Sequence, residues 1–159
     1  MKKISYIITI PYAYNADRNG SHYTLDGGKT YKNNGEFLES VAKHYRGLDY
    51  MVNPSTSYDN GSDIPELNAS VKSSGATLAS ITGETVEDIL KTYFERVHST
   101  LWIYMVRIDD TATEYHMNRA EFERFLRTWY KVDKDRNGQL KVRFKKTGPS
   151  MVRWLESYL

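Results

Sequence analysis

The stretch Leu101–Ile108, with the sequence LWIYMVRI, constrains the fold of this chain more than any other. Seven of its eight residues are apolar, and the only charged residue is Arg107. A strand with one face in water alternates apolar and polar residues, whereas a strand buried on both faces is a continuous apolar run. We therefore expect this stretch to be a central strand of a sheet that is covered on both sides.

Apolar periodicity and turn signals place the other elements around this strand. We predict helices over residues 35–46, 83–98, 118–130 and 149–159, strands over residues 4–10, 67–73, 101–108, 114–117 and 139–145, and a hairpin or loop over residues 15–34. The residues suited to cap the first three helices are Asn33 or Asn34, Thr82 and Asn118. This order predicts an α/β fold in which a single mixed β-sheet is flanked by helices. At 159 residues, the chain is expected to form one domain over residues 1–159.

Composition excludes some chemistry and leaves other classes open. The chain has no cysteine, so disulfides, thiolate metal ligands and a thiol nucleophile are excluded. The apolar run after Met1 is too short and too polar for a secretion signal, and no stretch approaches the roughly 20 apolar residues of a membrane span. We therefore expect a cytoplasmic protein without a membrane partner. A formal charge of +2 is too small to indicate nucleic-acid binding by itself.

The stretch Tyr58–Leu78 is where we expect the chemistry. Asp63 follows the turn signal Asn60-Gly61 and precedes an Ile-Pro pair, which places it at the bend or end of a strand. In the strand that follows, the period of two puts Ser70 and Lys72 on one face. Two polar residues beside an acid at a strand bend can converge on one point. That arrangement suits a site for a metal ion and a phosphate.

These residues resemble a known nuclease motif. The pattern Asp63-x6-Ser70-x-Lys72, preceded by the helix GEFLESVAKHY that carries Glu36, resembles the PD-(D/E)XK nuclease superfamily, which includes type II restriction endonucleases and the mismatch-repair nicking enzyme. The run LWIYMVRIDDTATEYHMNRAEFERFLRTW also resembles the strand, hairpin and helix that follow the site in small restriction enzymes. The resemblance implies a restriction-endonuclease-like fold and cleavage of DNA with Mg²⁺, with Mn²⁺ as a substitute. Cleavage of both strands of a palindrome calls for a homodimer.

Ser70 departs from the family pattern, which usually has Glu or Asp at this position. A subset of restriction enzymes with Ser-x-Lys takes the missing carboxylate from the next helix, where this chain has Glu84 and Glu87. The resemblance therefore assigns the metal ion to Asp63 together with Glu36, Glu84 or Glu87. Lys72 would orient the attacking water and meet the phosphate charge, with hydrogen-bonding support from Ser70. If no carboxylate completes the site, the chain is an inactive nuclease-fold module that binds nucleic acid or a protein partner.

Two features of the last third offer other interpretations. The sequence VDKDRNGQLKVRF copies the first half of a calcium-binding EF-hand loop, from Asp133 to Gly138, but Phe144 stands where the loop needs a bidentate Glu. A polar turn between a helix and a strand explains the same residues. Basic residues are also concentrated here, and they form either a surface for a phosphate backbone or an ordinary solvated surface. They are Arg124, Arg127, Lys131, Lys134, Arg136, Lys141, Arg143, Lys145, Lys146 and Arg153.

Overall fold

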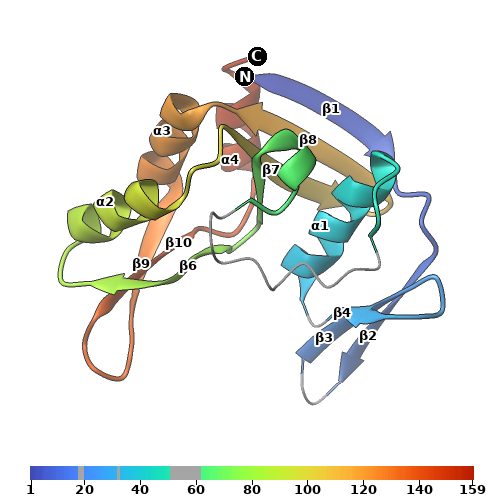
Figure 1. Cartoon of the computed structure of the whole chain (residues 1–159), viewed down its shortest axis with the longest axis horizontal. Coiled ribbons are helices and arrows are strands. Elements are labelled where there is room, and N and C mark those ends of the chain that lie inside the picture. The colour runs from blue at the N-terminus through green and yellow to red at the C-terminus, as the bar shows by residue number, and fades with distance from the viewer. Residues whose placement is uncertain (18–19, 32, 51–61) are drawn as a thin grey trace.

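The computed structural model describes residues 1–17, 20–31, 33–50 and 62–159, and these residues form an α/β protein (Figure 1). Its strands are β1 (Lys2–Ile7), β2 (Tyr12–Asp17), β3 (Gly20–Leu25), β4 (Thr30–Tyr31), β5 (Ala69–Ser73), β6 (Thr77–Gly83), β7 (Leu101–Ile108), β8 (Thr111–Met117), β9 (Tyr130–Lys134) and β10 (Leu140–Phe144). Its α-helices are α1 (Asn34–Tyr45), α2 (Val86–Arg96), α3 (Arg119–Trp129) and α4 (Pro149–Glu156).

The central sheet has the strand order β1-β8-β7-β5. β7 pairs in parallel with β5 and antiparallel with β8, so the sheet is mixed and β5 forms one of its edges. Residues 102–105 of β7 are all buried. The prediction of a central strand covered on both faces is therefore confirmed.

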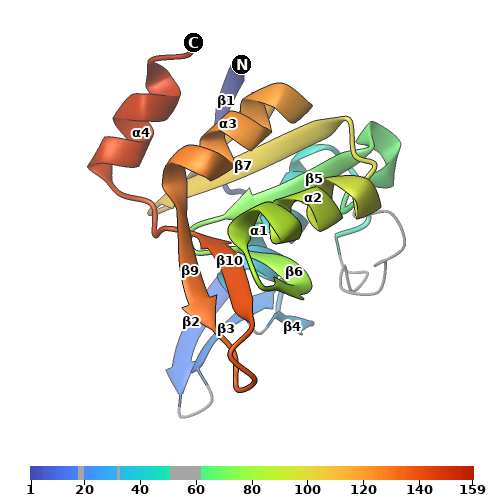
Figure 2. The ribbon, with the colours of Figure 1, turned by 90° about the vertical axis from the view of Figure 1, so that its left-hand side faces the viewer.

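Each face of β7 packs into a different core. Ile103 and Met105 belong to a core shared with α1 and the β2-β3-β4 sheet, whereas Trp102 and Tyr104 belong to a core shared with α2, α3, α4 and the β6-β10-β9 sheet. Figures 1 and 2 show these groups of elements on opposite sides of the central sheet. The second core is rich in aromatic rings, such as Trp102 stacked on Phe122 with ring centres 5.0 Å apart.

Arg107, the one charged residue of the central strand, lies against aromatic rings. Its guanidinium is 5.3 Å from the ring centre of Tyr23 and 5.5 Å from that of Phe37. It also donates a hydrogen bond of 2.9 Å to the Tyr23 hydroxyl. These cation–π contacts and the hydrogen bond partly replace the water that the half-buried guanidinium loses.

The strands of the described residues form three sheets, where we expected one. β6 and β9 were not predicted, and both pair with β10. Because β6 takes Thr82 into its pairing with Lys141, the second helix begins later than predicted, and Thr85 caps it by accepting from the Asp88 amide. The caps at Asn33 and Asn118 are confirmed, the latter as a complete capping box. The predicted turn at Asn60-Gly61 lies outside the described residues.

Within the part of the chain that the structure describes, no helix is long and apolar enough to cross a membrane.

Candidate functional site

Asp63 lies at the exposed edge of the central sheet. It precedes a short 3-10 helix, Pro65–Leu67, after which the chain returns along β5 through an antiparallel bridge between Ile64 and Ala69. The Asp63 carboxylate accepts a hydrogen bond of 2.7 Å from the backbone amide of Val71. Because β5 is an edge strand, this amide would otherwise lack a partner in the ladder. The hydrogen bond fixes the carboxylate beside the middle of β5.

Lys72 and Ser70 lie on the face of β5 that turns toward α2, as the period of two predicted. The ammonium of Lys72 is 5.9 Å from the ring centre of Tyr93 in α2, and it is close enough to Asp63 to favour the ionised carboxylate. Ser70 is buried, and its hydroxyl is 2.7 Å from the hydroxyl of Ser99, in the loop before β7. Ser70 thus ties β5 to that loop, and its side chain points into the fold rather than toward Asp63.

Helix α1 packs against β5 and carries a second carboxylate, Glu39, on which the Asp63 charge acts. Glu36, Glu39 and Lys43 share one side of α1 because they are three and four residues apart. Glu39 is nearly buried, and its Oε1 lies 3.4 Å from the Lys43 ammonium. That oxygen has no hydrogen-bond partner among the described residues. A buried carboxylate oxygen without a hydrogen bond is costly, and it marks a position suited to a further cation.

The pKa of both carboxyl groups is raised, and the Asp63 charge contributes to the rise at Glu39. Burial and the nearby Asp63 charge together raise the pKa of Glu39 from 4.5 to about 8, against the lowering influence of Lys43. Burial also raises the pKa of Asp63, against the lowering influence of Lys72, the Val71 amide and Lys43. Near neutral pH the pair therefore retains a proton. The buried Glu39 and the half-buried Asp63, with Lys43 and Lys72 acting on them, form an arrangement that a divalent cation can stabilise by replacing that proton.

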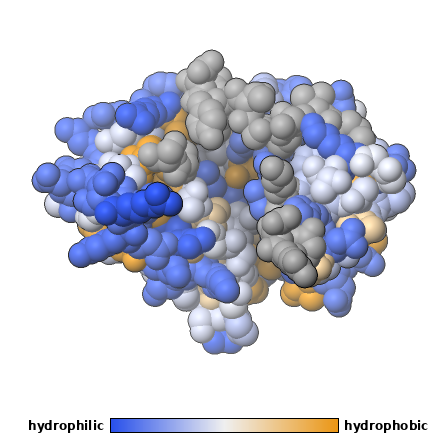
Figure 3. All heavy atoms as spheres, turned by 90° about the horizontal axis from the view of Figure 1, so that it is seen from below, coloured by the Kyte–Doolittle hydropathy of each residue, from blue (hydrophilic) through white to orange (hydrophobic). Residues whose placement is uncertain are grey.

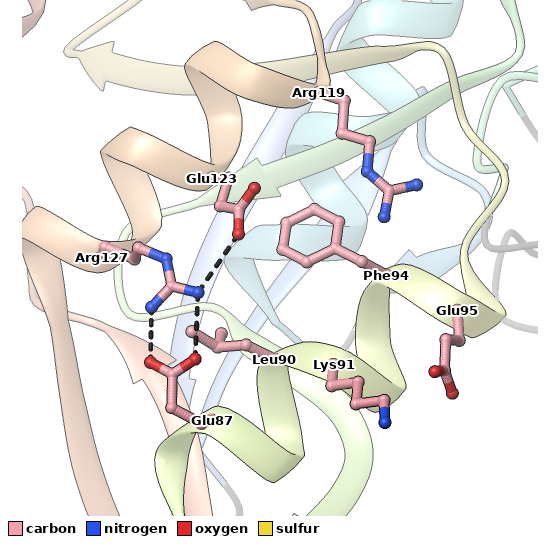
Figure 4. Close-up of a pocket in the computed structure, with 8 residues that line it drawn as sticks. All are labelled: Glu87, Leu90, Lys91, Phe94, Glu95, Arg119, Glu123 and Arg127. Carbon is pink, nitrogen blue, oxygen red and sulfur yellow. Dashed lines mark hydrogen bonds and ion pairs between the residues drawn. The ribbon is translucent and has the colours of Figure 1, made fainter.

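The other predicted carboxylates do not approach Asp63 in this way. Glu36 is half-buried in the first turn of α1, and its charge is the smallest of the influences on the pKa of Glu39, whereas the Asp63 charge is the largest after burial. Glu84 is exposed between β6 and α2. Glu87 is exposed and pairs with Arg127 of α3 at 2.6 Å (Figure 4).

The pair formed by Glu87 and Arg127 lies beside a pocket of about 340 Å³ between α2 and α3 (Figure 4). The floor of this pocket contains the buried side chains of Leu90 and Phe94, and Arg119 stacks 4.9 Å from the Phe94 ring centre. Glu87 thus has a partner of its own on the helical surface. The carboxylate beside Asp63 comes from α1, not from the helix that follows Lys72.

Glu39 was not predicted as a site residue, although the sequence carries a signal for it. It stands between two apolar pairs of α1, Phe37-Leu38 and Val41-Ala42, so it falls within the buried part of the helix. An acid in such a position is seldom structural, because burying an unpaired carboxylate is unfavourable. Together with Lys43 one turn later, this position marks Glu39 as a candidate site residue.

The interpretation of residues 132–144 as half of a calcium loop is wrong. Strands β9 and β10 flank this segment, where an EF-hand has helices. Asp133 pairs with Arg143 at 3.1 Å, and Asp135 accepts hydrogen bonds of 2.9 Å from the backbone amides of Asn137 and Gln139. Both acids therefore serve a β-hairpin.

Few side chains near Asp63 could act as ligands of a metal ion. In residues 1–17, 20–31, 33–50 and 62–159, no three Asp, Glu or His side chains are grouped closely enough to form a complete protein metal site. Mg²⁺ requires fewer, because it keeps several waters and is commonly held by one or two carboxylates together with substrate phosphates. The pair Glu39 and Asp63 fits that requirement. Comparisons with models of known protein families, with curated proteins and with solved structures find no match to this chain.

Proposed function

We propose that this protein is a Mg²⁺-dependent DNA endonuclease of restriction type, with Glu39, Asp63 and Lys72 as its central residues. The observation that carries the proposal is that Asp63, beside β5, interacts electrostatically with Glu39 of α1 and with Lys72, and that the pKa of each carboxyl group is raised. The proposal includes a restriction-endonuclease-like arrangement of the central sheet and a homodimer for cleavage of both strands.

The residues divide the chemistry among them. Glu39 and Asp63 would hold the cation, and their oxygens are the hard ligands that Mg²⁺ and Mn²⁺ accept. When bound, the ion supplies neutralisation of the phosphate and activation of the attacking water. Lys72 places a positive charge next to Asp63, where it can hold a phosphate oxygen or orient the water. Lys43 compensates the Glu39 charge when no cation is present.

Replacing Asp63 with asparagine or Lys72 with methionine is expected to lower the rate of DNA cleavage by at least about 10²-fold, because each removes a charge that acts on the phosphate or its cation. Asparagine can still accept the hydrogen bond from the Val71 amide, so the fold of the edge is retained. The measurement is nicking of supercoiled plasmid and of labelled duplexes with Mg²⁺ or Mn²⁺. Asp109→Asn, in the exposed turn between β7 and β8, is the matched control, and equal loss in this variant would contradict the assignment.

Cation affinity is expected to rise with pH. Binding requires both carboxylates to be ionised, and Glu39 loses its proton only near pH 8. Between about pH 6 and about pH 8, displacement of one proton would increase the affinity by up to about tenfold per pH unit. Titration of Mn²⁺ followed by electron paramagnetic resonance measures this slope. An affinity that does not change over this range would exclude the carboxylate pair as the binding site.

A second function is favoured by the position of Ser70. Its buried hydroxyl contributes no carboxylate, which leaves the cation with two protein ligands of that kind. With so few ligands, a nuclease-fold module can bind nucleic acid or a protein partner without cutting. In that case, purified protein would bind duplex DNA but leave it intact with Mg²⁺ and with Mn²⁺, and Asp63→Asn would not change the outcome.

A further inference from the structure

The β9-β10 hairpin and the residues after it concentrate the positive charge of this protein. Residues 130–146 contain seven basic and two acidic residues, a net charge of +5. The whole chain is +2, so the rest carries a net charge of −3. This uneven distribution concentrates positive charge on one part of the surface, although the total charge of the chain is small.

The basic residues gather on one face of the β6-β10-β9 sheet. Directly paired residues of neighbouring strands lie on the same face, and the pairs here are Lys131 with Arg143 and Lys141 with Asp133. Lys131 and Lys141 are exposed and form no salt bridge within the described residues. The one acid of this face, Asp133, is neutralised by Arg143. The face is completed on β6 by the exposed hydroxyls of Thr77 and Thr82.

The opposite face of the same sheet packs into the core. Val142 and Phe144 are buried there, and Tyr130, the cross-strand partner of Phe144, packs against the same core. The aromatic rings of these three strands are therefore on the inner face. We propose that the outer face, defined by Lys131, Lys141, Arg143, Thr77 and Thr82, binds the sugar-phosphate backbone of a DNA duplex.

The chemistry of the outer face selects the duplex backbone over bases or single strands. Lysine, arginine and threonine side chains donate hydrogen bonds to phosphate oxygens without regard to sequence. Binding of single strands relies on aromatic side chains that stack on bases. Because the rings point inward, the outer face offers charge and hydrogen bonds but no stacking surface.

Short hydrogen bonds connect this face to the candidate site. Arg143 donates hydrogen bonds of 3.2 and 3.1 Å to the carbonyl oxygen of Gly75, three residues beyond Lys72. The Phe144 amide donates one of 2.8 Å to the carbonyl oxygen of Ala76. The basic face therefore begins where β5 ends, and a backbone lying across it would continue toward Lys72.

The views of the molecule agree with this placement. In Figures 1 and 2 the β9-β10 hairpin projects from the central sheet on the side away from the two termini. Figure 3, seen from that side, shows a predominantly hydrophilic surface in the part that corresponds to the left of Figure 1. The inference rests on the proposed function for the identity of the ligand, and cleavage itself is not part of it.

The experiment compares two triple variants built on Asp63→Asn, so that cleavage cannot interfere. One replaces Lys131 and Lys141 of the face, together with the exposed Lys145 that directly follows β10, with glutamine. The charge-matched control replaces Lys2, Lys91 and Arg96, which are exposed on β1 and α2, with glutamine. Affinity for a labelled DNA duplex and for the corresponding single strand is measured by fluorescence anisotropy over a series of salt concentrations, without divalent cation. Each lost phosphate contact lowers the slope of log affinity against log salt by about 0.9.

We expect the first triple variant to lose about 2 to 3 units of this slope and about tenfold to a hundredfold of duplex affinity, while the control keeps both. Equal losses in the two variants, or no loss in the first, would overturn the proposed face. If the Asp63→Asn protein bound the single strand more tightly than the duplex, and the first triple variant lost that binding, the choice of a duplex as the ligand would be overturned. If the wild-type protein bound the duplex through this face but never cleaved it, the proposed nuclease activity would be refuted and the proposed DNA-binding face would still stand.

Discussion

Replacing Glu39 with glutamine is expected to have opposite effects on activity and stability. Cleavage should fall by about 10²-fold to 10³-fold, because the cation loses one of its two carboxylates. The free energy of unfolding at about pH 8 should rise by about 1–3 kcal/mol, because a buried charge is replaced by a neutral amide of the same shape. Lys43 keeps a carboxylate neighbour in the variant, since it also acts on Asp63.

The pH dependence of stability explains why the free energy of unfolding should rise, not fall, in Glu39→Gln. The pKa of Glu39 is raised from 4.5 to about 8 on folding, so the folded protein binds the proton more tightly than the unfolded chain does. The stabilisation is therefore complete below 4.5 and is lost as the pH rises through about 8. Urea denaturation at several pH values should show this decline in the wild type and a flatter curve in Glu39→Gln.

Glu36→Gln is the matched control for Glu39, since it changes the same side of the same helix one turn earlier. We expect it to keep most of the activity and the pH dependence of the wild type. If Glu36→Gln abolished cleavage and Glu39→Gln did not, the carboxylate of the site would be the one first predicted from the sequence.

Replacing Glu114 with glutamine is expected to lower the free energy of unfolding by about 3–5 kcal/mol, the usual cost of breaking a buried ion pair. Glu114 of β8 is fully buried and accepts hydrogen bonds from the two terminal nitrogens of the Arg46 guanidinium, at 2.9 and 2.6 Å. It also accepts hydrogen bonds from Tyr6 at 2.6 Å and lies 2.8 Å from the His116 ring nitrogen. Glutamine would leave the Arg46 charge without its partner.

The Glu114 effect should also depend on pH. Burial alone would raise the pKa of Glu114, but the hydrogen bonds from its partners outweigh burial and lower the pKa to about 2. Its contribution is therefore present above 4.5 and disappears as the pH falls through about 2. Urea denaturation of Glu87→Gln provides the control, because Glu87 makes the same contact with Arg127 in full exposure. A similar loss of stability in both variants would show that burial is not the cause.

Local patterns made much of the fold predictable. The continuous apolar run of β7, the N-cap of α1, the capping box of α3 and the apolar stripes of both helices are encoded within a few neighbouring residues. β6 and β9 have no such pattern, because they are strands only through pairing with β10, which is distant from β6 in sequence. Thr82 and Thr85 both suit a helix cap, and tertiary pairing selected the second.

The site was predictable only in part for a related reason. Asp63 and Lys72 belong to one short stretch, so their approach follows from a turn and a strand. The second carboxylate depends on how α1 is rotated against β5, and that rotation is set by the packing of Phe37 and Val41 in a core assembled from distant elements. Ser70 was placed on the correct face, but its partner Ser99 comes from a separate loop.

The position of β5 at the edge of the sheet has a consequence for the order of folding. β7 and β8 are joined by a tight turn and can pair early, whereas β5 joins β7 in parallel, which requires the intervening β6 and α2 to close a long loop first. Contacts of high sequence separation form late. Asp63 and Lys72 therefore take up their places beside α1 only after most of the core is assembled, so the apolar surface would be buried before the proposed cation site is complete.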